Sequence, residues 1–200
     1  MPIDLENTQS SRARLLASGK TLFAKHGYEQ TSTASIAREA MTSESQLIRN
    51  FGGKAGLLQA IFNQCWEPLN RKIAERVGEA PSARDAIQSI LSILIDEFLR
   101  DQEIAFLFLF EGRRFRGHQH EVALSEGFVE FLQLMHRLIE RAQEEGSLGR
   151  HYQQAALASA IMGAAEGMIR DRLAAIRSGL PPPFSEDDIR QMFQSLFEAL

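Results

Sequence analysis

The chain has 200 residues, 44% hydrophobic and 24% charged, a composition typical of a globular protein with room for a large core. The longest apolar run, residues 104–110, is too short to span a bilayer, and the acidic N-terminus lacks the apolar stretch of a secretory signal. A single cysteine, Cys65, excludes an internal disulfide and favours a reducing compartment, so we expect a cytoplasmic protein without a membrane partner.

The charge is spread unevenly along the chain. The formal net charge is −4, yet residues 12–56 carry +4, so the remainder carries −8. A basic segment on an acidic body suits a protein that touches a polyanion with one part only. The excess is small, so it indicates a nucleic-acid partner only in combination with other signals.

Helical periodicity runs through nearly the whole sequence, and alternation with period two is almost absent. This pattern predicts an all-α protein. We expect about nine helices, at residues 9–25, 33–40, 44–50, 54–78, 83–100, 102–115, 121–145 and 152–178 and in the segment after Ser185.

Capping and breaking residues support these boundaries. Ser32, Ser43, Ser82 and Ser185 stand where N-caps are needed, and Ser43 with Gln46 has the spacing of a reciprocal capping box. The glycines at 52–53 and the prolines at 181–183 are stops, and Pro68 inside the fourth helix predicts a kink.

Residues 31–56 have the proportions of a helix-turn-helix unit, in which the second short helix enters the DNA major groove. Leu47 and Phe51 would then pack inward, while hydrogen-bonding side chains on the outer side read bases or phosphates. The alternative is that these helices only pack together, with Glu44 serving its own helix dipole. The candidate DNA contacts are Ser32, Thr33, Ser43, Glu44, Ser45, Gln46, Arg49, Asn50 and Lys54.

Residues 12–58 resemble the N-terminal domain of the tetracycline-repressor-like (TetR) transcription regulators. The matching positions are Leu15-Leu16, Leu22-Phe23-Ala24, Gly27-Tyr28, Thr31-Ser32, Ile36-Ala37, Ala40, Ser43, Leu47, Phe51, Lys54 and Leu57-Leu58. The resemblance implies a three-helix DNA-binding domain at 1–53 and a helical bundle for ligand binding and dimerisation at 54–200.

Four positions depart from the family pattern, and at one of them Ser45 stands where the family usually has a small residue. Met41 stands where the family usually has glycine, and Met at a positive φ costs about 1 kcal/mol. Ile48 replaces an aromatic residue that typically holds a phosphate, and Asn50 replaces His or Tyr. The operator sequence therefore cannot be carried over from relatives.

The body is rich in phenylalanine, with 13 in the chain. Clustered aromatic and Met side chains either fill a core or line an apolar cavity, and the resemblance implies a cavity. Glu166 lies at the surface or faces that cavity, where Arg113 or Arg114 would pair with it. The candidate ligand residues are Trp66, Phe106, Phe110, Arg113, Phe128, Phe131, Met135, Met162 and Glu166.

Small residues at helical spacing in the eighth helix allow another helix to approach closely, either from the same subunit or from a second copy. A short recognition helix contacts few base pairs, so sequence specificity favours a dimer on a palindromic operator. The predicted dimer seam comprises Ala160, Gly163, Ala164, Gly167, Ile189, Phe193, Leu196 and Phe197.

Signals of catalysis are weak. The five histidines lack ligand spacing apart from an H-x-H pair, His118 and His120, and no phosphate-binding loop or nucleophile elbow is present. We therefore expect no enzyme, no cofactor and no metal.

The sequence predicts a homodimeric, ligand-responsive DNA-binding regulator, a repressor rather than an activator, released by an apolar or amphipathic small molecule. The alternative is a protein of the same fold that binds a lipid or metabolite and has lost DNA binding.

Overall fold

A computed structural model describes residues 10–111 and 125–199. The described part is helical and contains no strand, which confirms the predicted fold class. The helices are α1 Ser11–His26, α2 Thr33–Glu39, α3 Glu44–Phe51, α4 Lys54–Glu79, α5 Ala83–Arg100, α6 Gln102–Phe106, the π-helical segment η1 Leu107–Glu111, α7 Glu126–Glu144, α8 Gln154–Arg177 and α9 Glu186–Ala199.

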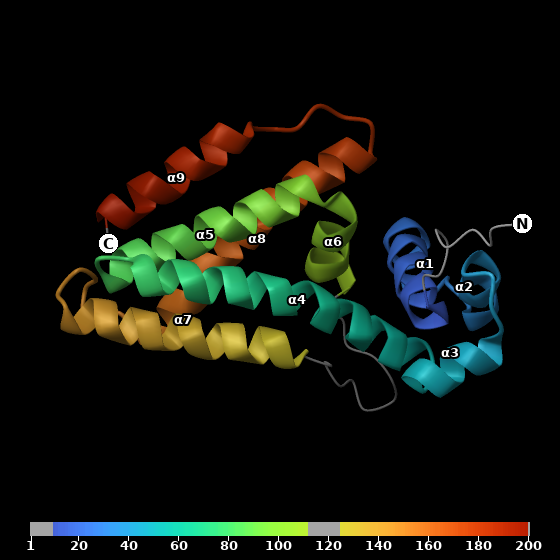
Figure 1. Cartoon of the computed structure of the whole chain (residues 1–200). Coiled ribbons are helices and arrows are strands. Elements are labelled where there is room, and N and C mark those ends of the chain that lie inside the picture. The colour runs from blue at the N-terminus through green and yellow to red at the C-terminus, as the bar shows by residue number, and fades with distance from the viewer. Residues whose placement is uncertain (1–9, 112–124, 200) are drawn as a thin grey trace, which may run out of the picture.

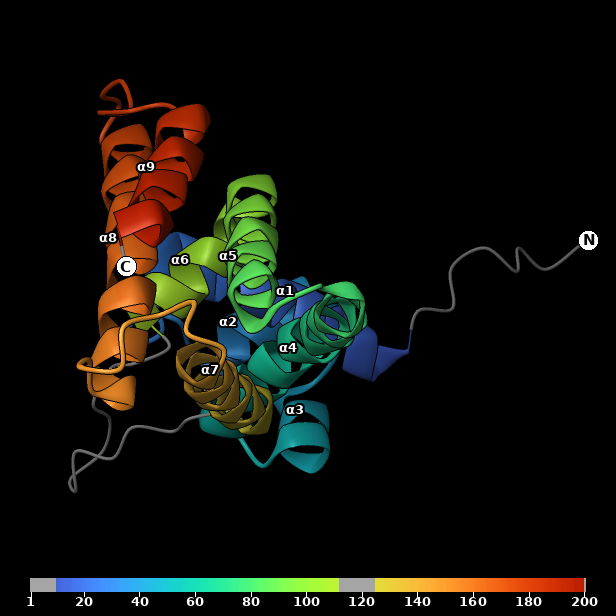
Figure 2. The same cartoon turned by 90° about the vertical axis from the view of Figure 1, so that its left-hand side faces the viewer.

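Helices α1 to α3 form a head at one end of the molecule, and α4 runs from this head into a body built from α5 to α9 (Figure 1). The short α6 lies between the end of α5 and α1. Viewed from the end, α8 and α9 lie on the side of the body away from α4 (Figure 2). The head therefore contacts the body through α4, α6 and η1, and through the end of α8.

The predicted helix boundaries are confirmed to within a few residues, except that the predicted helices 102–115 and 121–145 extend into residues 112–124, which lie outside the described part. The predicted helix 102–115 is a short α-helix that passes into the π-helical segment η1, and residues 112–115 lie outside the described part. A π-helical turn inside a helix often occurs at a functional site. Pro68 lies inside α4, and its ring removes the hydrogen bond that residue 68 would donate to the carbonyl of Gln64.

Helix α5 is the centre of the body, because it packs against α4, α7, α8 and α9. Its isoleucine and leucine side chains are buried on several faces, as expected for a helix surrounded by others. Glycine permits the closest approach between α7 and α4, since a Cβ at Gly127 would overlap the Cβ of Trp66. The body thus has one continuous apolar core.

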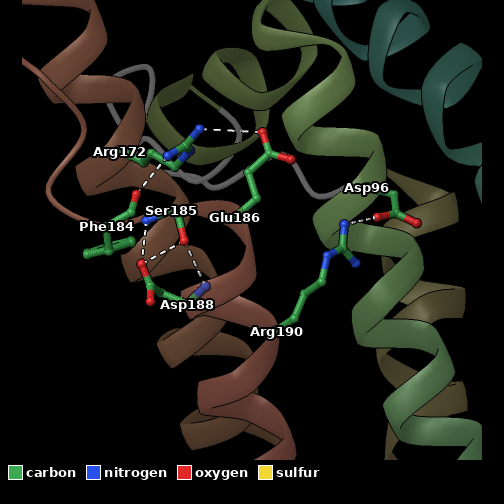
Figure 3. A network of polar contacts seen from close by, with 7 residues as sticks. All are labelled: Asp96, Arg172, Phe184, Ser185, Glu186, Asp188 and Arg190. Atoms are coloured by element: carbon green, nitrogen blue, oxygen red, sulfur yellow. Dashed lines mark hydrogen bonds and ion pairs between the residues drawn. The ribbon is translucent and has the colours of Figure 1, made fainter.

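Helix α9 is fastened to the body at its N-terminal end (Figure 3). Arg172 of α8 donates to the carbonyl of Phe184 at 2.7 Å, and Arg190 forms an ion pair with Asp96 of α5. Ser185 and Asp188 cap the helix reciprocally, because each side chain bonds the other's backbone N–H, at 2.7 and 3.1 Å.

The apolar stripe of α9 packs inside its own subunit. Ile189, Phe193 and Phe197 are buried in the core of the protomer, against the α5 side, while Leu196 is half-buried. Within the protomer these three side chains of the predicted seam pack on the α5 side, and the dimer seam itself stays a prediction.

Candidate nucleic-acid interface and ligand cleft

The three helices of the head are tied together by cationic side chains. Arg14 of α1 donates to the carbonyl of Ala40 at 2.9 Å, where α2 ends. The guanidinium of Arg12 lies 5.3 Å from the ring centroid of Phe51 in α3. These contacts and the buried Leu47 set the orientation of α3 on the head.

Both predicted N-caps of the short helices are confirmed. The hydroxyl of Ser32 accepts from the N–H of Ser35 at 3.1 Å, and that of Ser43 accepts from the N–H of Gln46 at 3.3 Å. The reciprocal half of the predicted box is replaced, because Oε1 of Gln46 accepts from Arg49 at 2.6 Å. Gln46 and Arg49 therefore form one polar unit.

The outer face of α3 is open to solvent. Glu44, Ser45, Ile48 and Arg49 are exposed there, and Glu44 accepts a weak hydrogen bond from Thr33 at 3.4 Å, which joins the starts of α3 and α2. In both views α3 lies at the outer edge of the head (Figures 1 and 2). No part of the described chain covers this face.

Two further candidate DNA contacts, Asn50 and Lys54, also form hydrogen bonds within the head. Asn50 donates to the backbone carbonyl of Gln46 at 2.8 Å. The ammonium of Lys54 donates to the carbonyl of Tyr28 at 3.0 Å and lies 4.3 Å from the centroid of the Tyr28 ring. Lys54 therefore fastens the start of α4 to the head, and a phosphate contact would use its remaining N–H groups.

Sequence reasoning missed Ile48 and Met41 as members of this surface. Ile48 is 57% exposed and Met41 is 77% exposed, with φ of +50°. Helical spacing could have identified Ile48, because it follows Ser45 by three positions and therefore shares its face. The positive φ confirms the strained turn expected at Met41.

A polar clasp joins the head to the body. Lys20 of α1 forms ion pairs with Asp101 at 2.7 Å and with Glu103 at 3.6 Å, both at the start of α6. Burial is the largest single effect on the pKa of Asp101 and raises it, but the hydrogen bond and charge of Lys20 and the backbone N–H donors of Ile104 and Glu103 together bring the pKa below the ordinary 3.8. Burial lowers the pKa of Lys20, but its hydrogen bond with Asp101 and the negative charges of Asp101 and Glu103 together carry that pKa above 10.5. Both groups are charged at neutral pH.

The predicted ligand residues form two aromatic groups. Trp66 lies 5.2 Å from Phe131 and 5.5 Å from Phe128 between ring centroids, next to the buried Met135. Phe106 and Phe110 stack on each other at 4.8 Å. Met162 is buried and Glu166 half-buried on α8, whereas Arg113 lies outside the described residues.

A cleft of about 390 Å³ opens between α4 and the α5–α6 corner. Phe108 joins it to the aromatic cluster, because its ring also lies 5.1 Å from Trp66 and 5.3 Å from Phe62. The lining combines an apolar floor with a charged rim: Gln64, Cys65, Pro68, Leu69, Lys72, Glu97, Phe98, Arg100, Asp101, Ile104 and Phe108.

Cys65 is unsuited to catalysis. Burial raises the pKa of its thiol to about 12; Lys20 lowers this pKa and Asp101 raises it, both by less than burial. The reactive thiolate is therefore scarce at neutral pH. Within residues 10–111 and 125–199, no three His, Cys, Asp or Glu side chains gather as a metal site would require. His118 and His120 lie outside these ranges.

The small-residue face of α8 is open. Ala160, Gly163 and Ala164 are exposed and Gly167 is half-buried, and a Cβ at Gly163 would meet no atom within 4 Å. In the described part of the chain, none of the helices has the length and apolar content that crossing a membrane demands.

Comparison with known proteins connects the head to one family. Residues 15–61 match the family model described as bacterial regulatory proteins, tetR family. A curated relative, the uncharacterized HTH-type transcriptional regulator YvkB of Bacillus subtilis, is 41% identical over 51 residues, which is 26% of this chain. The match spans only 27% of that relative's length.

Solved structures resemble the whole chain in fold. The fatty acid degradation regulator FadR from Bacillus halodurans superposes with a TM-score of 0.79 at 15% identity, covering 96% of both chains. FadR from Bacillus subtilis, solved in complex with stearoyl-CoA, gives a TM-score of 0.76 at 14% identity, covering 92% of this chain and 95% of that one.

Proposed function

We propose that the chain is a homodimeric repressor of the tetR family of bacterial regulatory proteins and acts on a palindromic operator, because residues 15–61 match that family model and the whole chain resembles a solved regulator in fold. The observation that carries this proposal is the outer face of α3, which is capped, exposed and held at the edge of the head. Arg49 with Gln46, and Ser45, are the polar groups that this face offers to bases and phosphates.

Selection from a random duplex pool tests the DNA-binding half of the proposal. Binding of the retained duplex should weaken steeply as salt rises, because counterions are released on binding. The logarithm of the association constant should fall with the logarithm of the salt concentration, with a slope of about −0.9 per phosphate contact. Arg49→Ala should weaken retention, and Gln46→Ala should change the preferred sequence. Arg76→Ala, an exposed arginine near the body end of α4, is the matched control and should have no effect.

The salt dependence of duplex retention distinguishes a head that binds DNA from one that does not. If no duplex is retained, or if retention ignores salt and Arg49, the alternative of a ligand-binding protein without DNA binding takes the place of this proposal.

The effector proposed here is amphipathic, with a long apolar chain and an anionic head group. Phe108 stands between the cleft and the aromatic cluster around Trp66, so a chain entering the cleft would reach that cluster by displacing this ring. Lys72 and Arg100 lie on the rim, both paired with Glu97, and phosphates of a head group would compete for them. The structural neighbour bound to stearoyl-CoA makes an acyl thioester the first compound to test.

Trp66 is the only tryptophan in the chain, so its emission reports on the aromatic cluster directly. Stearoyl-CoA should shift this emission, and coenzyme A without the acyl chain should not. Replacing both Lys72 and Arg100 with Gln should raise the concentration needed, whereas Arg76→Gln should not. An emission spectrum that stearoyl-CoA leaves unchanged contradicts the assignment of an acyl thioester.

For the effector to release the protein from its operator, it must bind the DNA-free form more tightly than the DNA-bound form. A difference of about 1–3 kcal/mol between these two binding free energies is sufficient. The proposed route runs along α4, whose Pro68 and Gln64 both line the cleft. Pro68→Ala restores the backbone donor, so an effector response of unchanged size in that variant would count against α4 as the route.

A further inference from the structure

Ile48 is an apolar side chain on the outer face of α3, where the other exposed residues, Glu44, Ser45 and Arg49, are polar. Successive helical residues are rotated by about 100°, so Ile48 projects between Glu44 and Ser45, with Arg49 on the next position. Leu47, rotated by about 100° from Ile48, is fully buried, which fixes the orientation of the helix. Ile48 remains 57% exposed in the subunit.

An isolated exposed isoleucine is common and requires no explanation by itself. Its position matters here because it lies on the face of α3 that is proposed to meet DNA. Arg49 donates to Gln46 at 2.6 Å, and Thr33 donates to Glu44 at 3.4 Å, on either side of it. Ile48 stands exposed between these polar groups and would enter the groove together with them.

The edges of the bases decide what such a side chain can contact. In the major groove every base presents hydrogen-bonding groups, and the one apolar group is the 5-methyl of thymine. Packing Ile48 against a cytosine amine or a guanine carbonyl would bury a polar atom without a partner, which is unfavourable. Packing it against a thymine methyl buries apolar surface on both sides.

We propose that Ile48 is a specificity-determining residue that selects thymine, through its 5-methyl group, at one position of each operator half-site. This inference rests on the proposed DNA-binding function. It assigns a base preference to a residue whose chemistry excludes the hydrogen bonds used by Gln46 and Arg49.

The test separates the methyl group from the rest of the base. A duplex is selected from a random pool with the native protein, then resynthesised with deoxyuridine replacing one thymine at a time. Uracil keeps every hydrogen-bonding group of thymine and lacks only the methyl. Losing one buried methyl should weaken binding about fourfold, and about 15-fold when both half-sites are changed.

The protein is then changed in parallel. Ile48→Ala should bind the thymine and uracil duplexes equally, while Ile48→Val, which keeps a branched apolar side chain, should still prefer thymine. Because Ile48 is exposed, both variants should keep the native circular dichroism spectrum and thermal midpoint. Ser45→Ala, on the same face, should leave the ratio between the two duplexes unchanged.

Two results overturn the inference while leaving the proposed function intact: uracil is tolerated at every position of a duplex that the protein binds, or Ile48→Ala keeps the preference for thymine. Failure to select any duplex with salt-dependent binding would remove the proposed function, and this inference with it.

Discussion

The guanidinium of Arg177, the last residue of α8, donates a hydrogen bond of 2.7 Å to the backbone carbonyl of Ala24 near the end of α1. The same guanidinium lies 3.8 Å from the ring centroid of Phe106 in α6. One side chain of α8 therefore contacts two other helices, α1 of the head and α6 of the body. Together with the ion pair between Lys20 and Asp101, it connects the body to the head independently of α4.

Arg177→Ala should weaken the communication between effector and operator. The variant loses a charge-assisted hydrogen bond and a cation–π contact, each worth about 1 kcal/mol, so the effector-induced change in operator affinity should shrink about fivefold or more. Operator binding without effector should change little, since α3 is untouched. Titrations of operator with and without stearoyl-CoA measure this change. Arg137→Ala, an exposed arginine of α7, is the control, and an equal loss there would contradict the role of Arg177.

Asp101→Asn should remove the charge of the Lys20 clasp while keeping the N-cap of α6, because Asn also accepts from the N–H of Ile104. The folded-state pKa of Asp101 lies below 3.8, so its contribution to stability is full above that pH and disappears as pH falls through the lowered value. The raised pKa of Lys20 maintains the pair up to and above pH 10.5.

The expected difference in unfolding free energy between native protein and Asp101→Asn is about 1 kcal/mol or less at neutral pH, because the pair is partly exposed. Urea titrations at a series of pH values measure it. If the difference in unfolding free energy persists at pH 2, its cause is not the ion pair.

Met41→Gly should stabilise the protein. Met41 has φ of +50°, a conformation that costs a non-glycine residue about 1–2 kcal/mol, and the greater freedom of glycine in the unfolded chain offsets part of the gain. A net gain of about 1 kcal/mol would raise the thermal midpoint by about 2–4 °C. Met41→Ala keeps the strained backbone and should not raise the thermal midpoint. If Met41→Ala raises the midpoint as much as Met41→Gly does, the methionine side chain and not the backbone strain is the cause.

Gly163→Leu should dissociate the proposed dimer without unfolding the subunit. A side chain at Gly163 meets nothing in the protomer but would separate two closely packed α8 helices. Analytical ultracentrifugation should show a monomer with a native circular dichroism spectrum. Gly78→Leu, an exposed glycine of α4 with equally open surroundings, should leave the oligomeric state as it was. A dimer that survives Gly163→Leu would place the seam elsewhere.

Cys65 should react slowly with thiol reagents. Its pKa of about 12 leaves little thiolate at pH 8, and the side chain is partly buried in the cleft. Labelling with iodoacetamide should be much slower in the folded protein than in urea, and slower again with stearoyl-CoA in the cleft. Rapid labelling of the folded protein would contradict the buried, protonated thiol.

The helices could be predicted because their signals are local. Serine caps at 32, 43, 82 and 185, glycine stops and apolar spacing act within a few residues of chain, and the structure begins and ends its helices where they predict. The register of the head could be predicted for the same reason, since Leu47 and Phe51 are spaced to face α1 and α4.

The faces exposed by those helices were decided only by packing. An apolar stripe marks a face that must be covered, but it does not tell whether the cover is the same subunit or another; for Ile189, Phe193 and Phe197 it is α5. Hydrogen-bond partners follow the same rule: Gln46 bonds Arg49, and Lys54 bonds Tyr28, because tertiary contacts bring competing acceptors and donors within reach. Local sequence determined where this chain is helical, and long-range burial determined which side chains remain free to meet DNA, a ligand or a second subunit.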